Sequence, residues 1–270
     1  MDQQRQSLFR LTKQRKTILD LLRRYTYLRT AHFYSLVQAD RDGGQRAVRR
    51  LLYDFWKRGY LVRRPVVDYD APGPLPRYEN VYWLSSRAVE FMRDSADFDE
   101  GLICVSEKSP HSLEHDIAIT EFHLAVERVC LANGWPLYWQ QHHLKRTVNP
   151  DALFALTDPR LPEEESTSYY FLEVERSRQG SYRDNQSGLL RKLERYRDYH
   201  RSEACLREWE WFDEFSVVIV VKNEIRRENL LAQLSEFLPY TSFLLTIAGS
   251  DLTGPAFLAP GNNANRSFFV

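Results

Sequence analysis

Three carboxylates lie at the ends of two short apolar segments near the middle of the 270-residue chain. Asp151 precedes the run 152–156, and Glu173 and Glu175 follow the run 169–172. Both runs are predicted to be strands. Residues two apart on a strand point to the same side, so Glu173 and Glu175 should share a partner, with Asp151 nearby if the strands form a hairpin. Clustered carboxylates predict a site for Mg²⁺ or Mn²⁺.

The elements around these carboxylates follow from hydrophobic periodicity. The order α-β-β-β-α-β-α-β predicts an α/β (α+β) domain, a mixed sheet flanked by helices. Acidic residues at strand ends are also common on solvated surfaces, and that is the alternative interpretation of the carboxylates. The predicted helices cover 113–133, 186–201 and 226–238, and the predicted strands cover 137–146, the segments beginning at 151 and 169, 215–221 and 242–247.

Two histidines near the start of the first of these helices are candidate site-lining residues. His115 falls on the side of the apolar stripe when residues are placed at 100° intervals, and His111 does so if the helix begins early. A core or capping role is the alternative for an inward-facing histidine. Arg176, which follows the third carboxylate, is a further candidate for lining the site.

The first quarter of the chain has a strong excess of positive charge. The segment 1–64 contains 16 Lys and Arg against 5 Asp and Glu, a balance of +11, whereas the whole chain has a formal net charge of zero. Such asymmetry indicates a nucleic-acid-binding segment joined to a chemically different domain.

This basic segment has the element order of a winged helix-turn-helix. Helices are predicted over 13–25, 30–37 and 45–58, with a turn at Asp42-Gly-Gly44 before the third helix and a β-hairpin after it. The third helix is the candidate recognition helix. A solvated basic surface or a dimerisation module is the alternative. The candidate DNA-binding residues lie on this helix and on or beside the wing: Arg46, Arg49, Arg50, Tyr53, Lys57, Arg63, Arg64 and Arg77.

Composition and cysteine usage narrow the class of protein. The chain is long enough for two domains, and its 43% hydrophobic and 27% charged residues are typical of a globular protein. We expect a cytoplasmic protein without a membrane partner, because the sequence has no signal peptide and no membrane-spanning run. Cys104, Cys130 and Cys205 lack metal or redox spacing, as expected in a reducing compartment.

The predicted domain organisation has four parts. A winged-helix domain covers 1–95, a polar linker covers 96–110, the domain with the carboxylates covers 111–250, and an irregular tail rich in Gly, Pro and Asn covers 251–270.

Together these features resemble the replication-relaxation family and the related MobC-type plasmid relaxases. The resemblance covers roughly 8–247 and implies a PD-(D/E)xK, or restriction-endonuclease-like, domain behind the winged helix. It further implies metal-dependent nicking at a plasmid or mobile-element origin in a prokaryotic cytoplasm. The motifs that carry it are His115-Asp116, Pro150-Asp151, Phe171-Leu-Glu-Val-Glu175 and Leu190-Arg-Lys-Leu-Glu-Arg-Tyr196.

Carried over to this chain, the resemblance assigns roles to individual residues. Asp151 and Glu173 match the metal-binding acids, and Glu175 stands where many nucleases of this fold have lysine. Lys192, on the following helix, is then the candidate for the missing ammonium group. The implied partners are double-stranded origin DNA, a relaxosome accessory protein and a second copy of the chain.

Other functions stay open at this point. With the lysine missing from its usual position, the chain could be a non-catalytic DNA-binding regulator with a degenerate nuclease fold. A restriction or repair nuclease would differ from a relaxase by cutting both strands. A nick could be hydrolytic or could pass through a tyrosyl phosphodiester, for which Tyr182, Tyr196 and Tyr199 are candidates.

Overall fold

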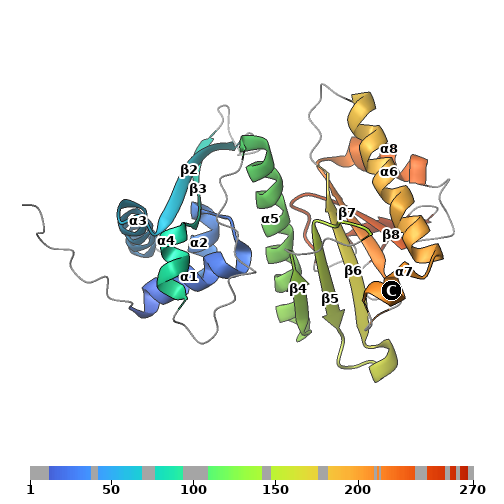
Figure 1. Cartoon of the computed structure of the whole chain (residues 1–270), viewed down its shortest axis with the longest axis horizontal. Coiled ribbons are helices and arrows are strands. Elements are labelled where there is room, and N and C mark those ends of the chain that lie inside the picture. Colours follow the sequence, from blue (N-terminus) through green and yellow to red (C-terminus); the bar gives the residue numbers. More distant parts are fainter. Residues whose placement is uncertain are drawn as a thin grey trace, which may run out of the picture. The chain divides into compact units, whose positions relative to one another are not determined.

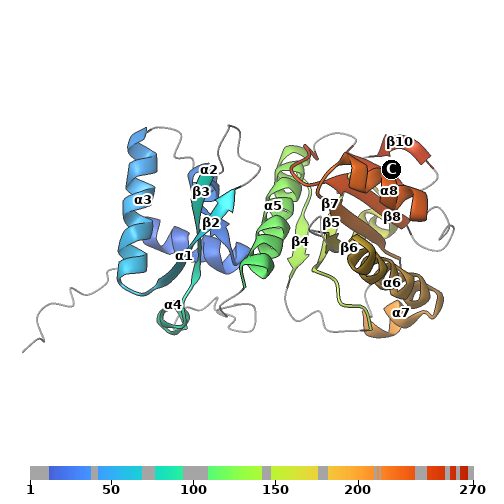
Figure 2. The same cartoon turned by 90° about the horizontal axis from the view of Figure 1, so that it is seen from above.

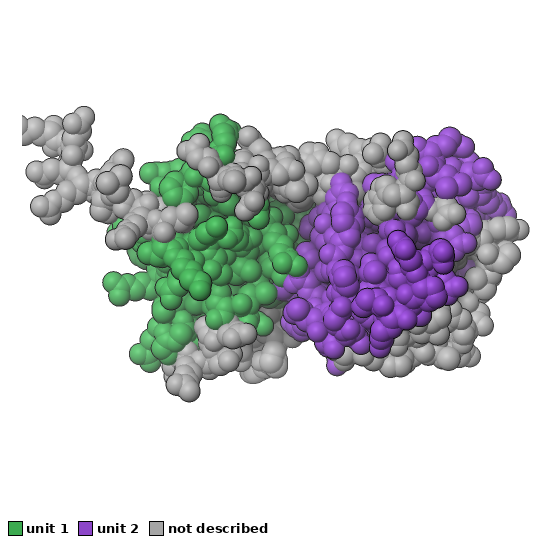
Figure 3. Space-filling view, turned by 90° about the horizontal axis from the view of Figure 1, so that it is seen from below, with its two compact units in different colours: residues 1–120 green, residues 121–270 purple. Residues whose placement is uncertain are grey.

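The structure is a computed structural model of the chain. Its helices and sheets confirm the predicted mixed α and β architecture (Figure 1). The chain divides into two compact units, unit 1 (Met1–Thr120) and unit 2 (Glu121–Val270), which Figure 3 colours separately. The residues described are 12–37, 42–68, 77–93, 109–141, 147–175, 182–209, 212, 214–234, 242–252, 256–259 and 262–266.

Unit 1 combines helices with a small antiparallel sheet of strand order β1-β3-β2. The three helices and the hairpin predicted for the basic segment are confirmed, and the two-residue strand β1 is an addition. The elements are α1 (Lys13–Tyr25), β1 (Leu28–Arg29), α2 (Thr30–Leu36), α3 (Asp42–Lys57), β2 (Leu61–Asp68), β3 (Arg77–Leu84), α4 (Ser86–Met92) and the first part of α5 (Pro110–Asn133).

Local chemistry explains the start of α1 and the end of α3 in unit 1. The Thr12 side chain accepts a hydrogen bond from the Arg15 backbone N–H at 3.4 Å and so caps α1. Gly59 follows α3 with a φ of +73°, which glycine adopts without steric cost. The predicted turn at 42–44 was wrong. Its residues form the first turn of α3, because neither Gly43 nor Gly44 has the positive φ that such a turn would use.

The first half of α5 contributes to the core of unit 1. Leu113 and Ile117 are fully buried in one cluster with Tyr27 and Trp83. The Thr120 hydroxyl donates to the backbone carbonyl of Tyr25 at 3.0 Å, which ties the same helix to the end of α1. Most of the predicted linker lies outside the described residues, so the sequence-based domain limits stay a prediction.

Unit 2 is built on a mixed sheet whose strand order, in the described part of the chain, is β10-β9-β8-β7-β6-β5-β4. Strands β4, β5 and β6 pair antiparallel, whereas β6, β7 and β8 are parallel. The predicted order of helices and strands is confirmed, with the short helices η2 and α7 added. The elements are β4 (Leu137–Gln140), β5 (Ala152–Thr157), η2 (Glu163–Glu165), β6 (Thr167–Val174), α6 (Tyr182–Arg201), α7 (Ala204–Glu208), β7 (Ser216–Val221), α8 (Glu224–Leu234), β8 (Ser242–Ile247), β9 (Phe257–Ala259) and β10 (Asn262–Arg266).

Helices cover both faces of this sheet (Figure 2). Helices α6, α7 and α8 pack on one face, where Phe171 and Phe215 meet Tyr196 in a large apolar cluster. The second half of α5 packs on the other face, where the rings of Phe122 and Phe154 lie 5.9 Å apart. Buried β-branched residues fill β7, as expected for a strand covered on both faces. No helix in the described ranges is long and apolar enough to span a lipid bilayer.

The end of the chain differs from the prediction of an irregular tail. Strand β9 pairs antiparallel with β8 through Leu245 and Leu258, and β10 pairs with β9. Phe257 is fully buried and anchors this ribbon to the core. The Gly, Pro and Asn residues of the segment favour turns, but burial of the phenylalanine and pairing with β8 outweigh that local preference.

Candidate functional site

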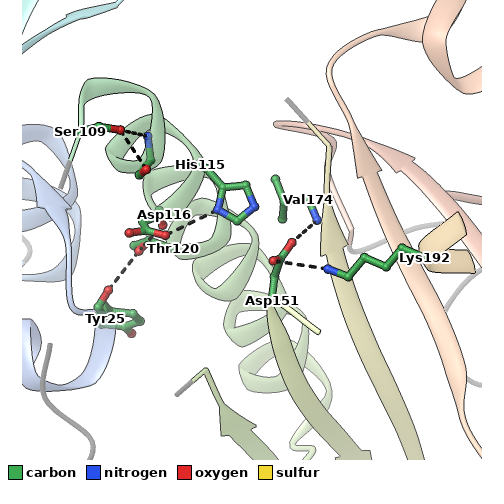
Figure 4. Close-up of polar contacts among 9 residues, drawn as sticks. Tyr25, Ser109, His115, Asp116, Thr120, Asp151, Val174 and Lys192 are labelled. Atoms are coloured by element: carbon green, nitrogen blue, oxygen red, sulfur yellow. Dashed lines mark hydrogen bonds and ion pairs between the residues drawn. The ribbon is translucent and has the colours of Figure 1, made fainter. Parts of the chain in front are cut away.

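Asp151 and Glu173 meet at the same end of the β5–β6 hairpin. Asp151 directly precedes β5, and its backbone N–H donates to the Leu172 carbonyl at 2.9 Å. Its carboxylate Oδ2 accepts from the backbone N–H of Val174 at 2.8 Å (Figure 4). One oxygen of Asp151 therefore continues the backbone pairing of the two strands, which fixes the direction of the other oxygen, Oδ1.

Helix α6 brings two polar groups to the carboxylate of Glu173. Lys192 Nζ binds Glu173 Oε2, and Tyr196 Oη donates to Glu173 Oε1 at 2.5 Å. Lys192 Nζ also lies 3.9 Å from Asp151 Oδ1. Residues four apart on a helix lie on the same face, so the Lys192 ammonium and the Tyr196 hydroxyl both reach the Glu173 carboxylate. The predicted grouping of Asp151, Glu173 and Lys192 is thus present, with the ammonium between the two carboxylates.

The carboxylate of Glu173 is almost completely shielded from solvent. Only 4% of its side chain is exposed, against 17% for Asp151 and 31% for Lys192. Burial raises the pKa of Glu173 to about 8, and the negative charge of Asp151 adds to this shift. Lys192 and Tyr196 act in the opposite direction, but burial outweighs them. In the absence of a further cation the site therefore favours a protonated Glu173 at neutral pH.

Glu175 lies apart from this pair of carboxylates. Its carboxylate forms a bidentate ion pair with Arg226 of α8, with distances of 2.7 Å to Nη2 and 2.8 Å to Nε. Both side chains are about nine-tenths buried. Glu173 and Glu175 do point to one face of the sheet, as alternation requires, but they meet different helices. The prediction that three carboxylates meet at one site was therefore wrong for Glu175, because its carboxylate is bound to Arg226.

The remaining donor set fits a small hard cation. Among the residues that the structure describes, no three or more His, Cys, Asp and Glu side chains form a group able to hold a metal ion. Mg²⁺, however, is commonly held by one or two carboxylates and completes its octahedron with water. Asp151 and Glu173 would supply those carboxylates, and the ion would take the position between them at which the Lys192 ammonium now lies.

The other predicted residues of the site are only partly described. His115 lies in unit 1, where its Nδ1 is 3.5 Å from Asp116 Oδ1. The side chain of His111 and the whole of Arg176 lie outside the described residues. Burial and the charge of Glu173 raise the pKa of Tyr196 well above its ordinary value, and its ring is fully buried. Tyr196 is therefore a hydrogen-bond donor to Glu173 and not an accessible nucleophile.

The candidate DNA-binding residues of unit 1 lie mostly on one exposed surface. Arg46, Arg49, Arg50, Tyr53 and Lys57 are exposed on α3. The side chains of Arg63 and Arg64 are half-buried on β2. Arg77 opens β3, and its side chain lies outside the described residues.

Sequence reasoning missed the contacts of three residues. Tyr196 could have been found as a partner of Glu173, because it lies one helical turn after Lys192. The guanidinium of Arg63 lies over the Trp56 ring at 3.7 Å. The position of Trp56, seven residues after Arg49, could have placed it on the same side of the helix as that arginine. Arg226 gave no local signal, since it is 51 residues from Glu175.

Comparison with known proteins places the chain in one family. The sequence model of the family described as replication-relaxation matches residues 19–214. The searches of curated proteins and of solved structures give no match. The matched range begins in α1, includes Asp151, Glu173 and Lys192, and ends before β7. It covers well over half of the chain, and so the protein belongs to the replication-relaxation family.

Proposed function

We propose that this protein binds DNA at a plasmid or mobile-element origin and nicks it in a metal-dependent, relaxase-like reaction. The observation that carries the proposal is the position of Lys192 between the carboxylates of Asp151 and Glu173, at the adjoining ends of β5 and β6. Family membership supports a role in replication or mobilisation.

The proposed roles follow from the geometry of the site. Asp151 and Glu173 would hold Mg²⁺ or Mn²⁺, which would activate water and stabilise charge on the scissile phosphate. Tyr196 keeps the Glu173 carboxylate in place from the buried side. Lys192 is partly exposed, so its ammonium can withdraw from the carboxylates and interact with the nucleophile or the phosphate.

The topology of both units supports this assignment. Strand β5 runs antiparallel to β4 and β6, and a helix then leads to the parallel strand β7. That is the α-β-β-β-α-β order of the PD-(D/E)xK fold. In unit 1 the helices α1 to α3 precede the β2–β3 hairpin, which is the order of a winged helix-turn-helix.

The experiment is nicking of a supercoiled plasmid that carries the origin region of the protein's own genetic element, with Mg²⁺ or Mn²⁺. Wild type should produce open circles, and chelation of the metal should abolish them. Glu173→Ala should lower the nicking rate by at least about a hundredfold, because it removes a group held at the reacting centre. The matched control is Glu164→Ala, which removes an exposed carboxylate of η2 and should nick at the wild-type rate.

A second function is favoured by a specific observation. Arg226 binds Glu175 and Lys192 binds Glu173, so both of these carboxyl groups already have a partner within the protein. This is the expected state of a degenerate nuclease that acts as a DNA-binding regulator. Binding of origin DNA that is equal for wild type and Glu173→Ala, with no nicking in either metal and with accessory proteins added, would establish that alternative.

A further inference from the structure

One exposed side of α3 combines cationic and aromatic side chains. Arg49, Tyr53 and Trp56 are four and seven residues apart, so they form one stripe along the helix, named here the α3 stripe. Tyr53 is 50% exposed and Trp56 is 36% exposed. Their rings lie 5.6 Å apart. A globular domain rarely leaves two adjacent large rings in solvent without a use for them.

At each end of the α3 stripe, an arginine is in contact with an aromatic ring. At one end, Arg49 Nε donates to Tyr34 Oη of α2, and the guanidinium lies 5.5 Å from the centre of the tyrosine ring. At the other end, the guanidinium of Arg63 lies over the Trp56 ring at 3.7 Å. The positive charge of Arg63 also acts on the hydroxyl of Tyr82, its cross-strand partner on β3.

Arg49 and Arg63 differ from two other arginines of unit 1, Arg15 and Arg58, in charge balance. Arg15 and Arg58 both bind the carboxylate of Asp54, at 2.8 Å and 2.7 Å. Within the described ranges, Arg49 and Arg63 have no carboxylate partner. Their positive charges are therefore held in place but not neutralised, whereas Arg15 and Arg58 are already satisfied by the protein.

This combination suits an anionic strand. Stacking of a guanidinium on a ring uses none of its five N–H donors, and the hydrogen bond from Arg49 Nε to Tyr34 leaves the two terminal nitrogens of Arg49 available for a phosphate. A side chain that is already ordered loses less rotamer freedom when its partner binds. In addition, the Arg63 guanidinium covers one face of Trp56, so the ring serves to support the arginine more than to stack a free base.

We propose that Trp56 and Tyr34 are positioning residues that hold Arg63 and Arg49 for the phosphates of a DNA duplex. The inference rests on the DNA binding proposed above. It adds two aromatic residues that the basic pattern of the sequence does not reveal, and it separates the arginines of unit 1 into those that contact DNA and those that do not.

The test is a double-mutant cycle on the full-length protein. Affinity for a labelled duplex of mixed sequence is measured by fluorescence anisotropy at several salt concentrations, for wild type, Trp56→Ala, Arg63→Ala and the double variant. Arg63→Ala should weaken binding about tenfold and lower the slope of log affinity against log salt by about 1. Trp56→Ala should weaken binding nearly as much, but should have almost no further effect when Arg63 is already alanine.

Two further variants separate positioning from folding. Trp56→Phe retains a ring under Arg63 and should recover most of the affinity, and Tyr34→Phe should weaken binding only when Arg49 is present. The matched control is Arg58→Ala, which removes an arginine already paired with Asp54 and should change affinity less than about twofold.

Three outcomes would overturn the inference. Independent, additive losses for Trp56→Ala and Arg63→Ala would mean that Trp56 does not act through Arg63. Tighter binding of a single-stranded oligonucleotide than of the duplex would mean that the rings stack bases. If wild type binds no DNA at all, the DNA-binding part of the proposed function fails, and the role given to Trp56 and Tyr34 fails with it.

Discussion

The charged groups of the two units are satisfied in different ways. On α3 of unit 1, Arg46 and Arg50 are exposed and have no carboxylate partner among the residues described. At the end of the β5–β6 hairpin in unit 2, Glu173 is buried and binds both Lys192 and Tyr196. The α3 surface of unit 1 leaves these charges exposed to solvent, whereas the buried carboxylate of unit 2 has partners within its own unit.

This difference gives a physical basis for the two roles proposed for the units, DNA recognition by unit 1 and phosphodiester chemistry in unit 2. Exposed cations cost little to maintain, because water solvates them until an anion replaces it, and their effect on binding depends on salt. Buried carboxylates lose hydration, so they persist only with hydrogen bonds and a counter-charge. Substitutions in unit 1 should therefore change affinity, and substitutions in unit 2 should change stability as well as activity.

The largest effect on stability is expected from Arg226→Ala. The substitution leaves the Glu175 carboxylate buried without its bidentate partner, and loss of one member of a buried pair typically costs about 3–5 kcal/mol. Urea unfolding measures the change. Arg227→Ala, on the same helix, breaks a pair with the half-exposed Glu224 and should cost less than about 1 kcal/mol. Equal costs for the two variants would mean that burial of the carboxylate does not determine the cost of losing its partner in unit 2.

The next largest effect is a pH dependence due to Glu173. Its pKa is raised from an ordinary 4.5 to about 8 in the folded protein, so the folded state binds this proton more tightly than the unfolded state. Its contribution to stability is therefore greatest below about pH 4.5 and is lost as the pH rises toward 8. In metal-free buffer, Glu173→Gln should melt at a higher temperature than wild type, by a margin that widens over this range.

The control for this prediction is an exposed carboxylate. Glu164→Gln should follow the melting curve of wild type at every pH, because η2 is exposed to solvent. A margin between Glu173→Gln and wild type that stays constant from acid to alkaline pH would show that Glu173 does not titrate as the geometry requires.

A smaller effect, confined to binding, is expected from Arg50→Ala. Removal of one exposed cation from α3 should weaken duplex binding by about 1 kcal/mol and lower the salt slope by about 1. The free energy of unfolding should stay within about 0.5 kcal/mol of wild type. Anisotropy and urea unfolding measure the two quantities. Arg207→Ala, which removes an exposed arginine of α7, should leave both unchanged.

The smallest effect concerns Asp54, an acidic residue of unit 1 that pairs with two arginines. Asp54 binds Arg15 and Arg58, so Asp54→Asn should release two cations and tighten non-specific duplex binding a few-fold. The loss of stability should be below about 1 kcal/mol, since the pairs are partly exposed. Asp20→Asn gives the same change in net charge without releasing an arginine. A matching gain in that variant would mean that only net charge matters.

Much of the fold could be predicted because the signals were local. The apolar spacing of α1, with Thr12 before it, predicted the bounds that the structure has. The β-branched run of β7 predicted a strand covered on both faces. Strands β9 and β10 were missed, because their residues favour turns and their pairing with β8 depends on contacts that no local window contains.

The candidate site was predictable in part for the same reason. Alternation along β6 correctly placed Glu173 and Glu175 on one face of the sheet. Which helix each acid would meet depended on the packing of α6 and α8, and the sequence holds no nearby signal for Arg226. Lys192 could be identified because it borders the buried side of an amphipathic helix. The contact of the Tyr196 hydroxyl with Glu173 was not predicted, although Tyr196 lies one turn after Lys192 on the same helix.

Helix α6 is also the connection between the parallel strands β6 and β7. Such crossovers are almost always right-handed, so the handedness of the chain determines on which face of the sheet Lys192 arrives. During evolution, insertions between β6 and α6 could lengthen the connection without transferring the lysine to the opposite face. The right-handed crossover therefore allows a lysine on this helix, and not only one on the strand, to deliver an ammonium group to the carboxylates of Asp151 and Glu173.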